Sequence, residues 1–189
     1  MAINLQKGQT INLDKTQFDL SQVLIGLGWD VNQTGGSSFD LDAFALLLNQ
    51  SEKLANDKDL VYFGNLKHPS GNLWHTGDNT TGEGDGDDEQ LIVKLDSLSS
   101  VFQKVLFAVN IYEATKRNQH FGKIQNAFIR AVDNKGKEMA RFELSGSEYI
   151  GKTAMIFAEV YRKDNGWKFR AIGNPISAES IHEVKAKYK

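Results

Sequence analysis

The chain contains no cysteine, and this absence excludes several kinds of site at once. Disulfide bonds, zinc–thiolate centres, iron–sulfur clusters and cysteine nucleophiles all need that residue. Proline is nearly absent too, with Pro69 and Pro175 the only 2 in the chain, so nothing indicates a hinge between domains. With 189 residues, 40% of them apolar, the chain can bury a proper core, and we expect one domain over residues 1–189.

Long apolar runs are missing as well. No stretch approaches the ~18 apolar residues that a membrane-spanning helix needs. The first fifteen residues hold no apolar run of signal-peptide length. We therefore expect a cytoplasmic protein without a transmembrane segment. An indirect association with a membrane, through partner proteins, stays open.

Acidic residues gather in one short segment. Residues 78–89 hold six Asp or Glu residues and no Lys or Arg, whereas the whole chain has a net charge of -2. The rest of the chain is mildly basic, without the clustered basic surface that is typical of nucleic-acid binding. This distribution predicts a cation as partner of the acidic segment and indicates no nucleic-acid partner.

Short apolar or alternating runs, separated by clusters of Gly, Asn, Asp and Ser, predict strands. These runs are residues 23–29, 44–48, 60–63, 91–95 and 105–112. Two hairpins are predicted as well, 127–132 with 138–144 and 155–162 with 167–172, and the glycine that ends each turn is expected to supply a positive φ. Roughly eight strands with such regular turns predict a mainly β fold, an antiparallel β-sandwich.

Helix signals are few. Residues 96–102 predict a short helix capped by Asp96. Residues 177–187 predict a C-terminal helix capped by Ser177, with Ile181, Val184 and Tyr188 on one face. We expect that face to pack onto the domain.

The acidic segment, residues 75–89, interleaves its carboxylates with four glycines. Glycine lets the backbone fold tightly and turn its carbonyls inward, as a calcium site of six to eight oxygens requires. Carboxylates crowded in a partly dry loop repel by roughly several kcal/mol, and a divalent cation removes that penalty. The segment is not an EF-hand, because Glu83 stands where that motif needs its central glycine and no helices flank it.

A second acidic group lies upstream. Asp30 ends one predicted strand, and Asp40 and Asp42 begin the next. In an extended segment, residues two apart point to the same side. Asp40 and Asp42 can therefore share one ion or border two, and with Asp30 they are expected to form the other wall of the same site.

The strings GLGWD at 26–30, DLDA at 40–43 and GDNTTGEGDGDDE at 77–89 resemble those of the TerD family of tellurium-resistance and general-stress proteins. The resemblance covers nearly the whole chain, including LQKGQTINL, FIRAVD and WKFRAIG. It implies a β-sandwich that binds calcium through acidic loops at one end, and a role in tolerance to tellurite and other chemical or envelope stress. The ligands that it implies, residue by residue, are Asp30, Asp40, Asp42, Asp78, Asn79, Asp85, Asp87, Asp88 and Glu89, with backbone carbonyls from Gly82 and Gly84.

One motif points elsewhere. Residues 146–153 satisfy the P-loop pattern G-x-x-x-x-G-K-[ST]. A P-loop opens a helix, whereas residues 154–161 predict a strand, and Tyr149 and Ile150 are bulky for a loop that wraps phosphates. A nucleotide- or anion-binding module, or a P-loop or metal-dependent hydrolase, remain as alternatives to a calcium-binding protein.

We expect a binding protein rather than an enzyme, because no trio of nucleophile, base and orienting group can be named. His75 lies near the acidic segment and is expected to be a turn or core-edge histidine. Scattered, solvated charges are expected for Arg117, Arg130, Arg141, Arg162 and Arg170, rather than an anion-binding face. The predicted protein is a scaffold that one or two calcium ions order, so that it presents a rigid surface to a protein partner.

Overall fold

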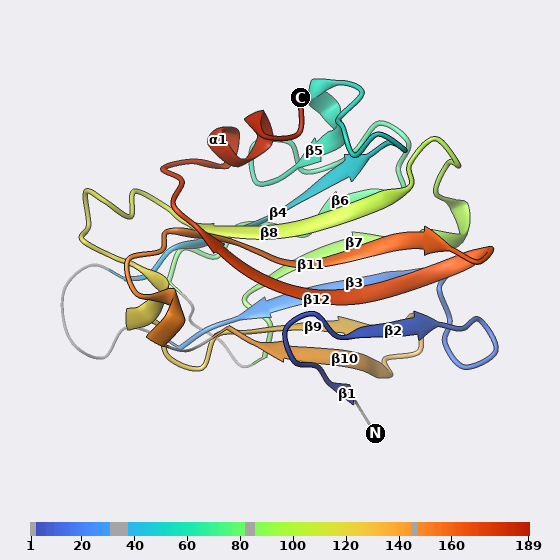
Figure 1. The fold of residues 1–189 in the computed structure, drawn as a ribbon, viewed down its shortest axis with the longest axis horizontal. Helices are drawn as coiled ribbons and strands as arrows, with labels where there is room; N and C mark the ends of the chain where they lie inside the picture. Colours follow the sequence, from blue (N-terminus) through green and yellow to red (C-terminus); the bar gives the residue numbers. More distant parts are fainter. Residues whose placement is uncertain (1–2, 31–37, 82–85, 145–146) are drawn as a thin grey trace.

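The computed structural model describes residues 3–30, 38–81, 86–144 and 147–189, whose strands form two six-stranded sheets (Figure 1). Sheet A comprises, in spatial order, β1 (Ile3–Asn4), β10 (Glu138–Glu143), β9 (Phe128–Val132), β3 (Val23–Gly28), β7 (Glu89–Val93) and β6 (Leu73–His75). Sheet B comprises β2 (Thr10–Leu13), β12 (Gly166–Ile176), β11 (Ala154–Lys163), β8 (Lys104–Ile111), β4 (Leu41–Leu48) and β5 (Leu60–Val61). Every pairing is antiparallel except that of β1 with β10, so the predicted antiparallel β-sandwich is confirmed.

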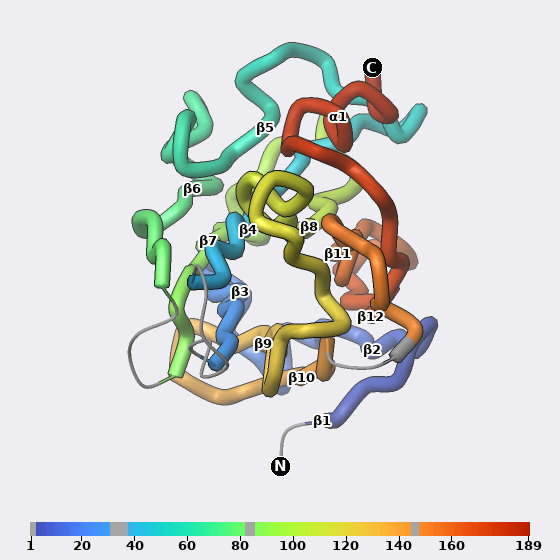
Figure 2. The backbone as a smooth tube through the Cα atoms, turned by 90° about the vertical axis from the view of Figure 1, so that its left-hand side faces the viewer, coloured from blue at the N-terminus to red at the C-terminus, as the bar shows by residue number. Residues whose placement is uncertain are grey.

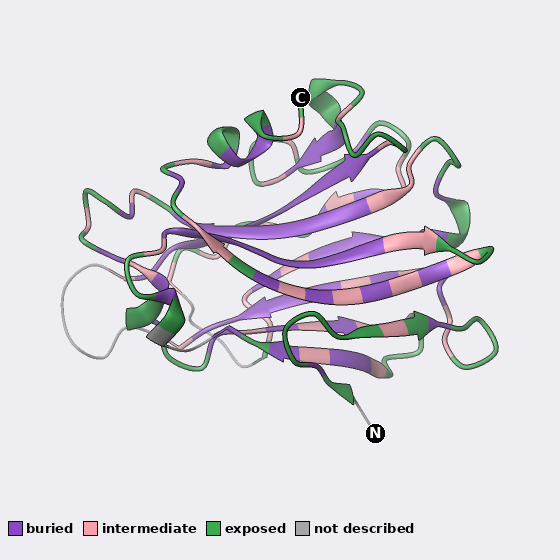
Figure 3. Cartoon of the chain, in the orientation of Figure 1, coloured by how far each residue is buried: buried purple, intermediate pink, exposed green. Residues whose placement is uncertain are grey.

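The main core lies between the two sheets. Strand β4 shows how the alternation of side chains builds it, because Leu41, Ala43 and Ala45 belong to this core. Phe44 and Leu46 point to the opposite face of sheet B, where they join a second apolar cluster. Both faces of β4 are therefore covered, and the strand is buried along its whole length (Figure 3).

The single described α-helix, α1 (Ile181–Ala186), helps to cover the outer face of sheet B near the C-terminus (Figure 1). Ile181 and Val184 are buried there, as the predicted apolar face requires. The predicted cap is wrong: the side chain of Ser180, not that of Ser177, accepts from the backbone N–H of Glu183. Because β12 continues to Ile176, the chain is still leaving the sheet at Ser177. No described helix is long and apolar enough to cross a membrane.

The helix predicted at residues 96–102 is also wrong. The structure has a single 3-10 turn at Leu95–Ser97, and it has no side-chain cap, so Asp96 lies inside the turn. The guanidinium of Arg162 donates to the carbonyls of Leu98 (2.7 Å) and Phe102 (3.1 Å), so a side chain from β11 satisfies groups that a helix would have used. The other 3-10 turns are Asp57–Asp59, Phe121–Lys123 and Ser147–Tyr149.

Both predicted hairpins form, β9 with β10 and β11 with β12. Gly136 supplies the expected positive φ of +79° in the first turn. In the second turn the positive φ values fall on Asp164 (53°) and Asn165 (59°) instead, as in a two-residue type I′ turn, so the role expected of Gly166 is wrong. The sequence does not predict β1, β2 or β6. All three strands are short and lie at the edges of their sheets.

Candidate metal centre

Four chain segments meet at one end of the sandwich, the left side of Figure 1 and the near side of Figure 2. Strands β3 and β6 end there, and β4 and β7 begin there. Since β7 runs antiparallel to both β3 and β6, the residues after β6 and before β7 lie next to the end of β3. This arrangement brings the motifs at 26–30, 40–43 and 77–89 together.

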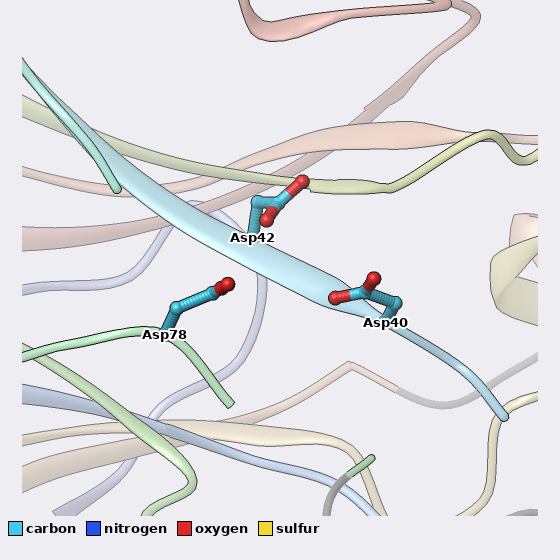
Figure 4. Close-up of side chains that lie close together, drawn as sticks. All are labelled: Asp40, Asp42 and Asp78. Atoms are coloured by element: carbon cyan, nitrogen blue, oxygen red, sulfur yellow. The ribbon is translucent and has the colours of Figure 1, made fainter. Parts of the chain in front are cut away.

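Three carboxylates converge at this end (Figure 4). Asp40 precedes β4, Asp42 lies within it and Asp78 follows β6, and one oxygen of each lies within 4.8 Å of the others. Two oxygens on opposite sides of a calcium ion, each about 2.4 Å from it, are about 4.8 Å apart, so the three side chains can reach one ion. Asp40 and Asp42 are buried and Asp78 is exposed, so the cluster opens to solvent on the Asp78 side.

The cluster carries excess negative charge. Within the described residues, no donor lies within hydrogen-bond distance of the Asp42 carboxylate, whose residue is 3% exposed. Burial raises the pKa of Asp42 to about 8, and the charges of Glu89, Asp40 and Asp78 add to the effect. Burial and Asp78 also raise the pKa of Asp40, against the opposing charge of Arg117, whose Nη1 lies 3.6 Å from Asp40 Oδ2.

Glu89 lies beside the cluster as a clamp. Its Oε2 accepts from the backbone N–H of Ala43 (2.6 Å) and lies 3.3 Å from His75 Nε2, while Oε1 accepts from the N–H of Asn79 (3.2 Å). Because β5 pairs with β4 only farther along, at Ala45 and Leu46, Glu89 satisfies an edge N–H that has no strand partner. Glu89 thus fixes the positions of the segments that carry Asp42 and Asp78.

His75 is buried at the end of β6, in keeping with the expected core-edge histidine. Its Nδ1 accepts from the backbone N–H of Gly77 (3.1 Å). The hydrogen-bond network therefore assigns the ring proton to Nε2, which donates to Glu89. His75 orients Glu89 and has no free nitrogen left for proton transfer or for a metal.

Asp87 is not brought into the three-carboxylate cluster. Both its oxygens accept from Arg130, Oδ1 from Nε (2.7 Å) and Oδ2 from Nη2 (3.0 Å), and its side chain is fully buried. Its carboxylate lies directly on β3, where a Cβ at Gly26 would be 2.2 Å from Asp87 Cγ. A Cβ at Gly28 would likewise be 2.6 Å from the carbonyl of Gly86. The glycines of the GLGWD motif thus let residues 86–87 pack onto sheet A.

Asp30 and Asp88 form a separate acidic pair. Asp88 accepts from the backbone N–H of Trp29 (2.9 Å) and from Asn79 Nδ2 (3.2 Å), and Asp30 accepts from Asn126 Nδ2 (2.6 Å). Burial raises the pKa of Asp88, with the charges of Asp87 and Asp30 adding to it. Asn79 joins the two groups, because its backbone binds Glu89 and its side chain binds Asp88. The other predicted ligands, Gly82, Gly84 and Asp85, lie outside the described residues.

A trio that the sequence does not reveal lies elsewhere in the fold. His68 Nδ1 is 2.8 Å from Ser70 Oγ, and His68 Nε2 is 3.2 Å from Asp59 Oδ1. The nearby N–H groups of Gly71 and Asn72 already donate to the His68 carbonyl and to Ser70 Oγ, so they are not free to stabilise an oxyanion. We interpret the trio as a tie between two turns.

The P-loop match lacks its structural context. Thr153 is followed by β11, a strand of an antiparallel sheet, where a P-loop opens a helix. The hydroxyl of Thr153 is buried and donates to the carbonyl of Ala178 (2.8 Å), so it is not presented to a phosphate or its magnesium ion. Gly146, the first residue of the motif, lies outside the described residues.

The five arginines are scattered as expected, but they are not simply solvated, because each has a partner. Their partners are Asp40 for Arg117, Asp87 for Arg130, Glu138 for Arg141, two backbone carbonyls for Arg162 and Glu159 for Arg170. They do not share one face, since Arg130 and Arg141 belong to sheet A and Arg162 and Arg170 to sheet B. The sequence places them on or between strands but does not show these partners, which are mostly distant along the chain.

Comparison with known proteins gives a family match over nearly the whole chain. A family model of the TerD domain matches residues 1–188. The chain is 46% identical to the tellurium resistance protein TerD of Serratia marcescens, over 100% of this chain and 97% of that protein. It is 43% identical to the stress response protein SCP2 of Bacillus subtilis, over 100% of both chains.

A solved structure shares the fold. It is a homologue of the telluride resistance protein TerD from Streptomyces coelicolor, with a TM-score of 0.70 and 21% identity, and the match covers 89% of this chain and 98% of that one. At this identity the match shows the architecture alone. The full-length family match and the relatives at 43% and 46% identity carry the assignment, and the chain belongs to the TerD family.

Proposed function

We propose that this protein is a calcium-binding stress-response protein, in which Asp40, Asp42 and Asp78 bind the ion. One observation carries the proposal: three carboxylates from two chain segments converge within 4.8 Å, and two of them are buried. Natural proteins pair buried charges or use them to coordinate metals. The described residues supply one nearby cation, Arg117, to three carboxylates and the adjacent Glu89.

The donor set favours a hard cation. All three groups offer carboxylate oxygens, which suit Ca²⁺ and Mg²⁺, whereas Zn²⁺ and copper sites are rich in imidazole and thiolate. The two imidazole nitrogens of His75 are both occupied, by Gly77 and Glu89. Asp30 and Asp88 form a distinct acidic pair, so a calcium titration also decides between one ion and two.

In this proposal the ion binds to the acidic segment, whose two ends are already held by hydrogen bonds. Glu89 binds the end that carries Asp78 and Asn79, and Arg130 binds the end that carries Asp87. Calcium cancels the repulsion that remains between the carboxylates and fixes the acidic segment as a rigid surface. In this proposal that surface binds a protein partner in the cytoplasm, without catalysis. The relatives named for tellurium resistance and stress response support the stress role.

Calorimetric titration with calcium tests the proposal. We expect the wild type to bind with measurable heat and to change its tryptophan fluorescence, because Trp29 donates its backbone N–H to Asp88 and Trp74 adjoins the site. The Asp42→Asn, Asp78→Asn double variant is expected to lose the heat. Asp164→Asn serves as matched control, since Asp164 is exposed in the β11–β12 turn.

The result that contradicts the proposal is a wild type with neither heat nor a thermal shift, or a double variant that binds like wild type. The partner is sought separately, by capture from lysate of the source cell with calcium and with chelator. A partner retained equally under both conditions would show that calcium does not control that surface.

A further inference from the structure

Asn110 lies on the β8 side of the cluster and is not one of the predicted ligands. In the register of β4 with β8, it stands directly opposite Asp42. Opposed residues of an antiparallel pair project from the same face, with Cβ atoms about 4.5–5.5 Å apart. Asn110 and Asp42 therefore share the outer face of sheet B.

The amide oxygen of Asn110 is an unpaired buried acceptor. The residue is 2% exposed, and its Oδ1 has no hydrogen-bond partner among the described residues. Nearly all buried polar groups in native proteins are paired, so an orphan of this kind needs an explanation. An ion or an ordered water is the usual one.

Two strand neighbours of Asn110 have side chains that cannot donate a hydrogen bond. Ala154, its register partner on β11, and Ala108, two residues before it on β8, are both apolar. Asp42, its partner on β4, is a second acceptor that lacks a described donor. These two acceptors stand opposite each other on one face of the sheet, next to the carboxylates of Asp40 and Asp78, so one cation can satisfy them together.

We propose that Asn110 is a further ligand of the cation, binding it through Oδ1 from the β8 side. This inference rests on the proposed function, since it concerns the same ion. A neutral amide carbonyl beside three carboxylates is a donor set typical of Ca²⁺, which takes six to eight oxygens. Mg²⁺ keeps several of its waters and needs fewer protein ligands, so Asn110 contributes to selectivity for calcium.

Two variants and one control test the role of Asn110. Asn110→Ala removes the oxygen, and Asn110→Asp keeps an oxygen of the same reach. Asn12→Ala is the control, because Asn12 is an exposed residue of β2 in the same sheet. Melting of the metal-free proteins establishes that each variant is folded.

The readouts are calcium and magnesium affinity by calorimetry, and the number of waters on bound Tb³⁺, from its luminescence lifetime in H₂O and D₂O. We expect Asn110→Ala to bind calcium about tenfold or more weakly, with a smaller loss for magnesium and one additional water on Tb³⁺. Asn110→Asp is expected to keep the wild-type water count, and Asn12→Ala to match wild type throughout.

The outcomes separate this inference from the function on which it rests. If the wild type binds no calcium, the proposed function fails. If the wild type binds calcium but Asn110→Ala keeps both its affinity and its water count, the ion is there and Asn110 is not a ligand. If Asn110→Ala does not fold, Asn110→Asp decides: a calcium affinity equal to that of wild type overturns the assignment, because a ligand that gains a negative charge must change the affinity.

Discussion

Asp42 and Asp87 are both buried carboxylates at the same end of the sandwich, yet their surroundings are opposite. Asp87 accepts two hydrogen bonds from Arg130 and lies on the bare backbone of Gly26. Asp42 has no described donor and has Glu89, Asp40 and Asp78 as neighbours, which raise its pKa together with burial. A buried carboxylate that is paired with a counter-ion is already compensated, whereas an unpaired one is costly unless a proton or a ligand compensates its charge.

The residues of the acidic segment have two different structural roles. The sequence presents Asp78, Asp87, Asp88 and Glu89 as equivalent members of one ligand set. In the structure Asp87 and Glu89 hold the segment in place, and Asp78 lies close to the carboxylates of Asp40 and Asp42. The anchor formed by Asp87 and Arg130 is therefore complete without an ion, whereas the proposed function places the ion at the three-carboxylate cluster. The two regions are separable by mutation.

Loss of Arg130 is expected to have the largest effect on the free energy of unfolding. Arg130→Ala leaves Asp87 buried without a counter-ion, and breaking a buried pair costs about 3–5 kcal/mol; Arg130 is partly exposed, so we expect about 2–3 kcal/mol of unfolding free energy. Urea denaturation with and without calcium measures it. A loss below about 0.5 kcal/mol, the range of ordinary surface substitutions, would show that the pair is not an anchor.

A methyl group added on β3 tests the packing of the same Asp87 carboxylate. Gly26→Ala places a Cβ 2.2 Å from Asp87 Cγ, so the carboxylate must shift, and overpacking of this kind costs about 1–3 kcal/mol. Gly166→Ala is the matched control, since the nearest atom to its new Cβ lies at 3.8 Å. Equal melting temperatures for the two variants would contradict the close packing of Asp87 on β3.

A substitution at Asp42 is expected to stabilise the metal-free protein instead of destabilising it. Asp42→Asn replaces a buried carboxyl group that folding must either protonate or leave charged without a donor, so the metal-free variant should be more stable than wild type at pH 7, by about 1 kcal/mol or more. The same variant should lose the stabilisation by calcium. Thermal melting with calcium and with chelator gives both numbers. A variant less stable than wild type without metal would mean that Asp42 already has a stabilising partner.

A pH dependence of the metal-free protein is expected from the same carboxyl group. The folded protein keeps the Asp42 proton up to about pH 8, whereas the unfolded chain loses it near 3.8. Between these values the folded state binds more protons, so stability falls as pH rises and is lowest above about pH 8. The difference in melting temperature between wild type and Asp42→Asn isolates this group. A difference that stays constant from pH 5 to 8 would contradict the raised pKa.

The fold could be predicted from the sequence because its signals are local. Alternating runs and turn residues are read within a few positions, and the two hairpins follow from them. The predicted cap at Ser177 failed because the length of β12 depends on its pairing with β11, which reaches Ile176. The predicted helix at 96–102 failed because Arg162, which is 60 and 64 residues away from its two carbonyl partners, takes the place of helical hydrogen bonds.

The sequence predicts the region of the candidate site, but it does not show which carboxylates of that region already have partners. Asp40, Asp42 and Asp78 stand out by composition and spacing. Whether a carboxylate is free depends on a partner that only the fold supplies, such as Arg130, 43 residues from Asp87. Asn110 carries no sequence signal at all, since one asparagine in an apolar strand becomes a candidate only through its register with Asp42.

Location of the ion tests most directly whether Asp40, Asp42 and Asp78 bind it. Anomalous scattering from crystals grown with calcium, or with a lanthanide in its place, would show the ion independently of any affinity. We predict an ion with oxygens of Asp40, Asp42 and Asp78 all within about 2.3–2.6 Å. An ion bound by Asp87 in place of Arg130, or no ion at the three carboxylates at saturating calcium, would contradict the account.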